Sequence, residues 1–303
     1  MNKSAEIYRK YLNPKVVSRL SGMDMRARLV VEGFMAGLHK SPYHGFSVEF
    51  AEHRQYMPGD EIKHIDWKVY GKTNRYYVKQ FEEETNLKAH ILLDCSGSMG
   101  YSSHEITKLQ YATWLAAAFS YLMIRQRDAI GLVSFDARIR RMIPPKSVAT
   151  YLPLMLHELD ALRPANTTNI AQTLHLVAEK IQRRGLIILF SDLFDSDPAA
   201  LIQSLKHFRH RNHEVIVFQI MDPLEESFGF TEDAVFEDME TGTRLGTQPW
   251  HIKDEYRKMM QEFLGKLRKA CRENRIDYVP LNTTTSYGLA LSRYLQKRRK
   301  IGG

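Results

Sequence analysis

An apolar stretch that ends on a carboxylate and passes into hydroxyl- and glycine-rich residues has the layout of a metal-binding loop. It runs from Ile91 to Gly100, and Asp94, Ser96 and Ser98 alternate along it. We expect a turn after a buried strand to direct this carboxylate and the two hydroxyls at one point. Such oxygen ligands suit Mg²⁺ or Mn²⁺, and two neutral hydroxyls leave the ion able to attract an acidic group. The alternative is that Ser, Gly and Asp only form the turn.

The D-x-S-x-S pattern after a hydrophobic strand resembles the metal-ion-dependent adhesion site of von Willebrand factor A domains. In that family a Thr from a second loop and an Asp at the end of a later strand complete the site. Here Thr168 precedes a predicted helix, and Asp192 follows a later apolar run. The two glycines that the family usually has before the Thr are missing, so Thr167 remains an alternative to Thr168. The resemblance implies Mg²⁺ or Mn²⁺ as cofactor, held by Asp94, Ser96, Ser98, Thr168 and Asp192.

A second motif, Tyr-x-Pro-Gly-Asp followed by Ile-Asp-Trp, precedes this loop. It contains Pro58, Gly59, Asp60, Asp66 and Trp67. From about residue 20 to its carboxyl terminus the chain resembles the bacterial DUF58 family, in which this motif precedes a von Willebrand A-like metal loop. Members are commonly found beside MoxR-type AAA+ ATPases and are thought to act with them as chaperone-like partners. The role of the motif stays open, and a structural one is favoured, in which Asp60 is a turn carboxylate, Asp66 forms a buried salt bridge and Trp67 is a core aromatic.

The composition is that of a globular protein. The chain has 303 residues, of which 44% are hydrophobic, so one large α/β domain or two modest domains are expected. The chain has only two cysteines, Cys95 and Cys271, which give no disulfide framework, and the first residues lack the apolar core of a signal peptide. The longest apolar stretch, residues 112–124, is too short to span a bilayer. We therefore expect a soluble, cytoplasmic protein.

The net charge of +8 is concentrated in the carboxyl-terminal region. Residues 250–303 contain thirteen Lys and Arg but five Asp and Glu, which accounts for the whole surplus. A basic region of this kind could bind nucleic acid, an anionic membrane surface or an acidic protein. It could also be no more than a solvated helix face, and the aromatic residues among these charges fit buried cores as well as stacking platforms.

From residue 87 the chain alternates between predicted strands and helices. This alternation predicts a mostly parallel, doubly wound α/β sheet of the von Willebrand A or Rossmann type, with helices on both faces. Ligands of such sheets bind at the carboxyl ends of the strands, where Asp94, Asp136, Asp192 and Asp222 all fall. The predicted strands are 89–94, 129–135, 139–143, 186–191, 214–221 and 276–281, and the predicted helices are 105–124, 148–162, 170–183, 198–210, 250–273 and 286–299.

Three regions are expected in the chain. Residues 1–45 form a helical lead-in, residues 46–86 form a β segment that contains the second motif, and residues 87–303 form the von Willebrand A-like domain. Within that domain, residues 228–248 interrupt the alternation with two short strands about a turn, which predicts an inserted β-hairpin. The hairpin and the strands of the β segment could together form a small β unit beside the main sheet.

The sequence favours a binding module over an enzyme. A phosphatase that forms an aspartyl-phosphate needs an acid two residues after Asp94, where Ser96 stands. No P-loop and no Gly-x-Ser-x-Gly motif is present, so neither ATP hydrolysis nor a serine hydrolase is predicted. We expect no catalytic residues and a metal-dependent protein-interaction module that acts with a MoxR-type ATPase or its client through an acidic residue. Binding of nucleic acid or of an anionic surface by residues 250–303 is the alternative, and a metal-dependent hydrolase is less favoured.

Overall fold

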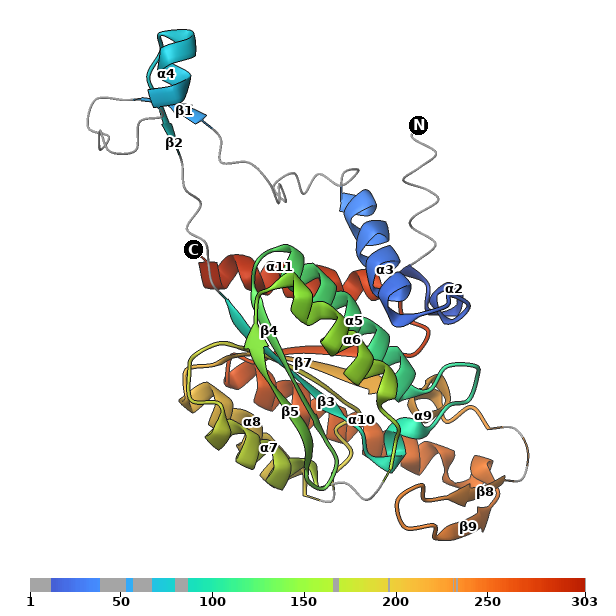
Figure 1. The fold of residues 1–303 in the computed structure, drawn as a ribbon. Coiled ribbons are helices and arrows are strands. Elements are labelled where there is room, and N and C mark those ends of the chain that lie inside the picture. Colours follow the sequence, from blue (N-terminus) through green and yellow to red (C-terminus); the bar gives the residue numbers. More distant parts are fainter. Residues whose placement is uncertain are drawn as a thin grey trace.

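A six-stranded sheet forms the centre of the computed structural model (Figure 1). The strand order is β10-β7-β6-β3-β4-β5, and every neighbouring pair is parallel except β4 and β5. The structure describes residues 12–38, 53–56, 67–79, 87–165, 169–195, 197–230, 232 and 234–302. The strands are β3 (Lys88–Asp94), β4 (Ala129–Phe135), β5 (Ile139–Lys146), β6 (Leu186–Ser191), β7 (Glu214–Met221) and β10 (Asp277–Asn282). The predicted mostly parallel α/β sheet is confirmed.

Helices cover both faces of the sheet and separate the core into two layers (Figure 1). Neighbouring residues of one strand serve opposite layers, since Ile91 packs into one cluster and Leu92 into the other. This is why the central strands are almost continuously apolar. One layer contains α3 (Met23–Leu38), α5 (Lys108–Arg125), α6 (Leu152–Ala161) and α11 (Tyr287–Gly302). The other layer contains α7 (Ile170–Lys180), α8 (Pro198–His210) and α10 (Pro249–Glu273).

Shorter elements surround this core. The predicted hairpin is present as β8 (Ala234–Glu237) and β9 (Arg244–Thr247), which pair with each other. A second two-stranded sheet consists of β1 (His53–Gln55) and β2 (Tyr77–Lys79), with α4 between them in sequence. In the part of the chain that the structure describes, the two small sheets are separate and do not form the joint β unit that the sequence suggested. The remaining elements are α2 (Pro14–Ser18), α4 (Trp67–Thr73), η3 (Gly97–Gly100), η4 (Ala149–Tyr151) and α9 (Pro223–Ser227).

The neighbouring parallel strands β3, β6 and β7 end at the same edge of the sheet (Figure 1). In the register of β3 and β6, Leu93 lies beside Phe190, so the residues that follow each strand are neighbours. This brings Asp94, at the end of β3, close to Asp192, which follows β6. The long apolar helix α5 begins nearby with a capping box in which Thr107 and Gln110 bond to each other's backbone amides. Across the described ranges, no helix is both long enough and apolar enough to span a bilayer.

The structure corrects two details of the prediction. The fifth strand continues through Pro144 and Pro145 to Lys146, three residues past the predicted end. Two prolines are tolerated because β5 is an edge strand, where a missing backbone amide leaves no ladder bond unmade. Trp67 is not a core aromatic, because 57% of its surface is exposed and its ring meets the edge of Tyr70. The expected strand at 46–50 lies outside the described residues.

Candidate functional site

Two carboxylates without solvent exposure form the centre of the predicted site. Asp94 and Asp192 are both fully buried at the carboxyl ends of β3 and β6. The carboxylate of Asp94 accepts hydrogen bonds from the backbone amide of Ser96 at 2.9 Å and from Oγ of Ser191 at 2.6 Å. Burial, together with the charge of Asp192, raises the pKa of Asp94 to about 7 despite these bonds. The site thus holds two acids that repel each other and gain from a nearby cation.

The hydroxyls of the first loop lie where the alternating pattern predicted them. Oγ of Ser96 and Oγ of Ser98 are 3.1 Å apart, with Ser96 buried and Ser98 partly exposed. The 3₁₀ turn η3 follows Ser96 directly, and this turn keeps the loop compact. At Gly100 an added Cβ atom would lie 2.9 Å from Cγ of Pro164, so the loop can approach its neighbour only with glycine here. The two hydroxyls and Asp94 therefore belong to one tightly packed loop.

Arg140 connects this loop to the loop that precedes α7, and the sequence analysis did not identify it. Its guanidinium donates to the carbonyl oxygens of Cys95 at 2.9 Å and Ala165 at 2.8 Å. It also donates to the carboxylate of Asp136 at 2.7 Å, so Asp136 positions the arginine. A backbone bond of 3.1 Å from the amide of Ala165 to the carbonyl of Cys95 strengthens the connection. The chain that leads to residues 166–168 is thereby attached to the loop that carries Asp94, Ser96 and Ser98.

Several predicted residues cannot be placed. Thr167 and Thr168 lie outside the described residues, and so do Pro58, Gly59, Asp60 and Asp66. The choice between the two threonines, and the role of the second motif, therefore stay predictions. The structure brings together Asp94, Ser96, Ser98 and Asp192 at the carboxyl ends of β3 and β6.

A buried lysine beside the second carboxylate is the other residue that the sequence analysis missed. The side chain of Lys108, at the start of α5, is fully buried, and its Nζ donates to Asp192 at 2.8 Å and to Glu225 at 2.6 Å. The ring of Phe194 lies 5.4 Å from the same nitrogen. Burial disfavours the ammonium, but the two carboxylates outweigh burial and raise the pKa of Lys108. An internal cation therefore already neutralises part of the charge of Asp192.

The donor set fits a hard divalent cation. Two carboxylates and two hydroxyls supply only oxygen ligands, which Mg²⁺ and Mn²⁺ prefer, and a cation there would stabilise the charged form of Asp94, whose pKa burial and Asp192 raise. In the described part of the chain there is no group of three or more His, Cys, Asp or Glu residues with the geometry of a metal site. Any metal at this edge would therefore depend on the serine hydroxyls and water as well as on the two aspartates.

Comparison with known proteins identifies relatives without an assigned activity. Residues 52–263 match the family model described as "Protein of unknown function DUF58". An uncharacterized protein of Mycobacterium tuberculosis strain H37Rv is 22% identical over 293 residues, which cover 95% of this chain and 91% of that protein. An uncharacterized protein of Mycobacterium bovis matches equally well.

Among solved structures, the conserved hypothetical protein BatB from Bacteroides thetaiotaomicron is 17% identical. The match has a TM-score of 0.46 and covers 71% of this chain and 99% of that chain. The VWA domain of SpRpn10 is 14% identical with a TM-score of 0.40, over 69% of this chain and 94% of that domain.

Proposed function

Because the chain belongs to the DUF58 family, whose function is unknown, we propose a role for it from the chemistry of its strand-edge site. The proposal is a non-enzymatic protein-interaction module that uses Mg²⁺ or Mn²⁺ to bind an acidic residue of its partner. The proposal depends on one observation: the carboxylates of Asp94 and Asp192 lie close to the hydroxyls of Ser96 and Ser98 at one edge of the sheet.

The electrostatics of the site favour a partner carboxylate. Asp94, Ser96 and Ser98 would hold the cation from the first loop, with Asp192 and a threonine of the second loop completing the set. A bound divalent ion would supply a positive centre with a position open to a further oxygen ligand. Since Lys108 already offsets Asp192, the site carries little surplus negative charge that would repel an incoming acid. An exposed Asp or Glu is the protein anion that fits this environment.

Apolar side chains beside the loop add a surface for a protein partner. The hairpin β8–β9 approaches the loop, since Cε of Met239 would be 3.4 Å from a Cβ atom at Gly100. Val235, Met239 and Leu245 of this hairpin are 68%, 50% and 61% exposed. Exposed apolar groups near a polar site are typical of interaction surfaces. We infer that the partner's acidic residue is flanked by apolar side chains.

Nucleophilic chemistry finds little support near the loop. Burial raises the pKa of the Cys95 thiol to about 12, so this thiol stays protonated at neutral pH. Ser102 and Asp222 lie 3.2 and 3.9 Å from His104, but both face the same ring nitrogen, Nδ1. A histidine that relays a proton between a serine and an aspartate needs both of its nitrogens. This supports a binding role over that of a hydrolase.

The family resemblance suggests the identity of the partner. We propose a MoxR-type AAA+ ATPase, or the client on which that ATPase acts, in chaperone-like assembly or maturation of a complex. Cys95 and Cys271 are free, buried thiols, which fit a reducing compartment such as the bacterial cytoplasm.

Co-purification of the ATPase on the tagged chain tests this function. We expect recovery with Mg²⁺, loss in EDTA, and loss for Asp94→Ala even with Mg²⁺, while Ser98→Ala weakens recovery without unfolding the chain. Asp254→Ala is the matched control, because it removes an exposed carboxylate from α10. Equal recovery in every sample would reject the proposal. Recovery that depends on salt but not on metal would assign binding to the basic region 250–303 instead.

A further inference from the structure

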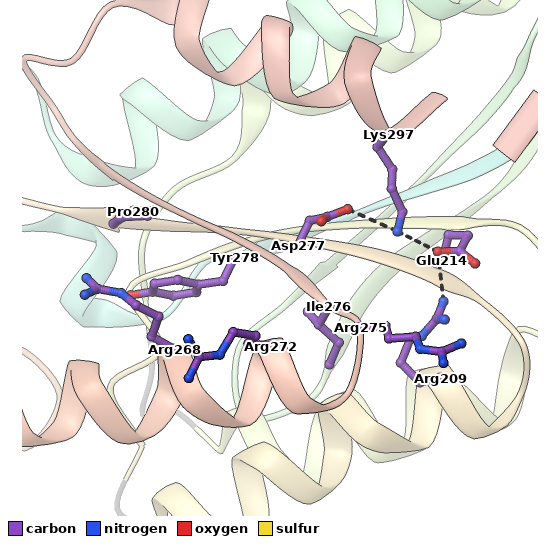
Figure 2. A pocket seen from close by; sticks show the side chains of 10 residues that line it. All are labelled: Arg209, Glu214, Arg268, Arg272, Arg275, Ile276, Asp277, Tyr278, Pro280 and Lys297. Atoms are coloured by element: carbon purple, nitrogen blue, oxygen red, sulfur yellow. Dashed lines mark ion pairs between the residues drawn. The ribbon is translucent and has the colours of Figure 1, made fainter. Parts of the chain in front are cut away.

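Figure 2 shows a basic pocket of about 670 Å³. It lies at the amino ends of the strands, whereas Asp94 and Asp192 lie at their carboxyl ends. It is found where β7 and β10 begin, and β10 is the last strand of the sheet on this side. The strand length of six to eight residues separates the two sites by roughly 20 Å. The pocket is lined by Arg209, Glu214, Arg268, Arg272, Arg275, Ile276, Asp277, Tyr278, Pro280 and Lys297.

The acidic side chains of the pocket are already paired. Glu214 accepts from Arg209 at 2.9 Å and from Lys297 at 2.6 Å, and Lys297 also lies 3.0 Å from Asp277 (Figure 2). Burial opposes the charge of Glu214, but Lys297 and Arg209 outweigh it and lower the pKa of this carboxyl. Two basic and two acidic side chains therefore neutralise each other at one end of the pocket.

Three further arginines have no such partner among the residues that the structure describes. Within the described residues, the side chains of Arg268, Arg272 and Arg275 make no ion pair and no hydrogen bond, and all three are exposed. Arg268 and Arg272 are one helical turn apart on α10, and Arg275 follows the end of this helix. Figure 2 shows them on the side of β10 that faces α10, with Lys297 entering from α11 on the other side. Three positive charges that no described residue pairs with thus line one wall of a concave site.

We propose that the basic pocket binds an extended, acidic segment of a partner protein. The guanidinium groups form bidentate pairs with carboxylates. Arg268 and Arg272 are separated by about 6 Å along the helix, and alternate side chains of an extended strand are about 6.6 Å apart, so acids at every second residue match this row. Among the described strands β10 pairs only with β7, so no other described strand forms a ladder with its outer side, and an extended segment could add there.

The remaining lining favours a peptide over a nucleic acid. Tyr278 is the aromatic residue of the pocket, and its hydroxyl is bonded to the side chain of Gln219. A partly buried ring held in this way is a poor platform for stacked bases. At one end of the pocket the carboxylates of Glu214 and Asp277 would repel an acidic residue of the bound segment. A neutral or basic residue of the segment fits there. This site is independent of the metal site in position and chemistry.

Fluorescence anisotropy with a labelled peptide of alternating Val and Glu tests the proposal on the full chain. We expect saturable binding that weakens with salt, and none for the same peptide with Gln in place of Glu. Arg268→Gln with Arg272→Gln should weaken binding about tenfold, whereas the matched control Lys258→Gln with Lys266→Gln should change it less than about twofold. The control removes two exposed charges from the same helix outside the pocket.

Arg275→Gly separates binding from folding. Arg275 has a left-handed backbone with φ of 56°, which glycine adopts without strain, so this variant should fold at least as well as the wild type. It should nevertheless bind the Glu peptide more weakly. EDTA and Asp94→Ala should leave peptide binding unchanged, so failure here is distinguishable from failure of the metal site. Equal binding of the Glu and Gln peptides, equal losses in the arginine and lysine variants, or tighter binding of a single-stranded oligonucleotide would overturn the proposal.

Discussion

Replacing Lys108 with Met should destabilise the chain strongly and make its stability more dependent on metal. The lysine side chain is fully buried and bonded to Asp192 and Glu225 at 2.8 and 2.6 Å. Met has a similar length but no charge, so the packing is retained and the cation is lost. The buried carboxylate of Asp192 then lies near those of Asp94 and Glu225 without the lysine cation beside it.

The size of the effect follows from the burial of the pair. Breaking a buried ion pair from one side costs about 3–5 kcal/mol, because the remaining charge is uncompensated. An unfolding entropy of ~2.1 cal/mol/K per residue over the 303 residues corresponds to roughly 1.6 °C per kcal/mol. The melting temperature of Lys108→Met should therefore fall by about 5–8 °C in EDTA. Saturating Mg²⁺ should raise it by more than it raises the wild type, since the cation now meets a larger negative charge.

Thermal unfolding with and without Mg²⁺ is the assay, and a double variant is its control. Lys108→Met combined with Glu225→Gln removes one positive and one negative charge, so it should recover part of the lost stability. If the melting temperature of Lys108→Met falls by less than about 1.6 °C, equivalent to ~1 kcal/mol, the buried ion pairs of Lys108 do not stabilise the fold as expected. A double variant that is no more stable than the single variant would refute it as well.

Two further perturbations test the loop packing and the buried histidine. Gly100→Ala should destabilise the chain by about 1–3 kcal/mol in urea unfolding, because the new Cβ meets Pro164 at 2.9 Å, whereas Gly265→Ala in the open interior of α10 should be neutral or stabilising. Burial, reinforced by His213, lowers the pKa of His90 to about 4, so between pH 6.5 and 4 the unfolded state binds more protons than the folded state. The free energy of unfolding should therefore fall by about 3 kcal/mol as the pH drops through this window. The variant His90→Leu should show a shallower pH dependence, and an unchanged one would mean that His90 is not its cause.

The main sheet could be predicted because local signals and tertiary structure agree. The strands β4 and β6 have their predicted bounds, because each is an apolar run that stops at a polar residue. Asp136 follows the last residue of β4, and Ser191 is the last residue of β6. The capping box at Thr107 sets the start of α5 at Lys108, three residues later than hydrophobicity alone suggested. The end of β5 was missed because prolines normally end a strand, and only the position at the sheet edge makes them acceptable.

The site was predictable only in part, for a physical reason. Asp94, Ser96 and Ser98 are neighbours in sequence, so their spacing already defines a loop with converging oxygens. Lys108 contacts groups that are 84 and 117 residues away, and no local pattern marks it. The one available signal was a lysine at the start of a helix whose other positions are almost all buried. Arg140 likewise acts through distant backbone carbonyls, which any sequence supplies.

Calorimetric titration of Mg²⁺ into the isolated chain, paired with its thermal shift, measures whether Asp94 and Asp192 hold a divalent ion. At about 100 times its Kd the ion should stabilise the wild type by about 2.7 kcal/mol, which is roughly 4 °C. Asp94→Ala should show neither binding heat nor shift, while Asp254→Ala, which lacks an exposed carboxylate of α10, should behave as the wild type. If Mg²⁺ and Mn²⁺ give neither heat nor shift with the wild type, or if Asp94→Ala responds as the wild type does, Asp94 and Asp192 do not form a metal site at the carboxyl ends of β3 and β6.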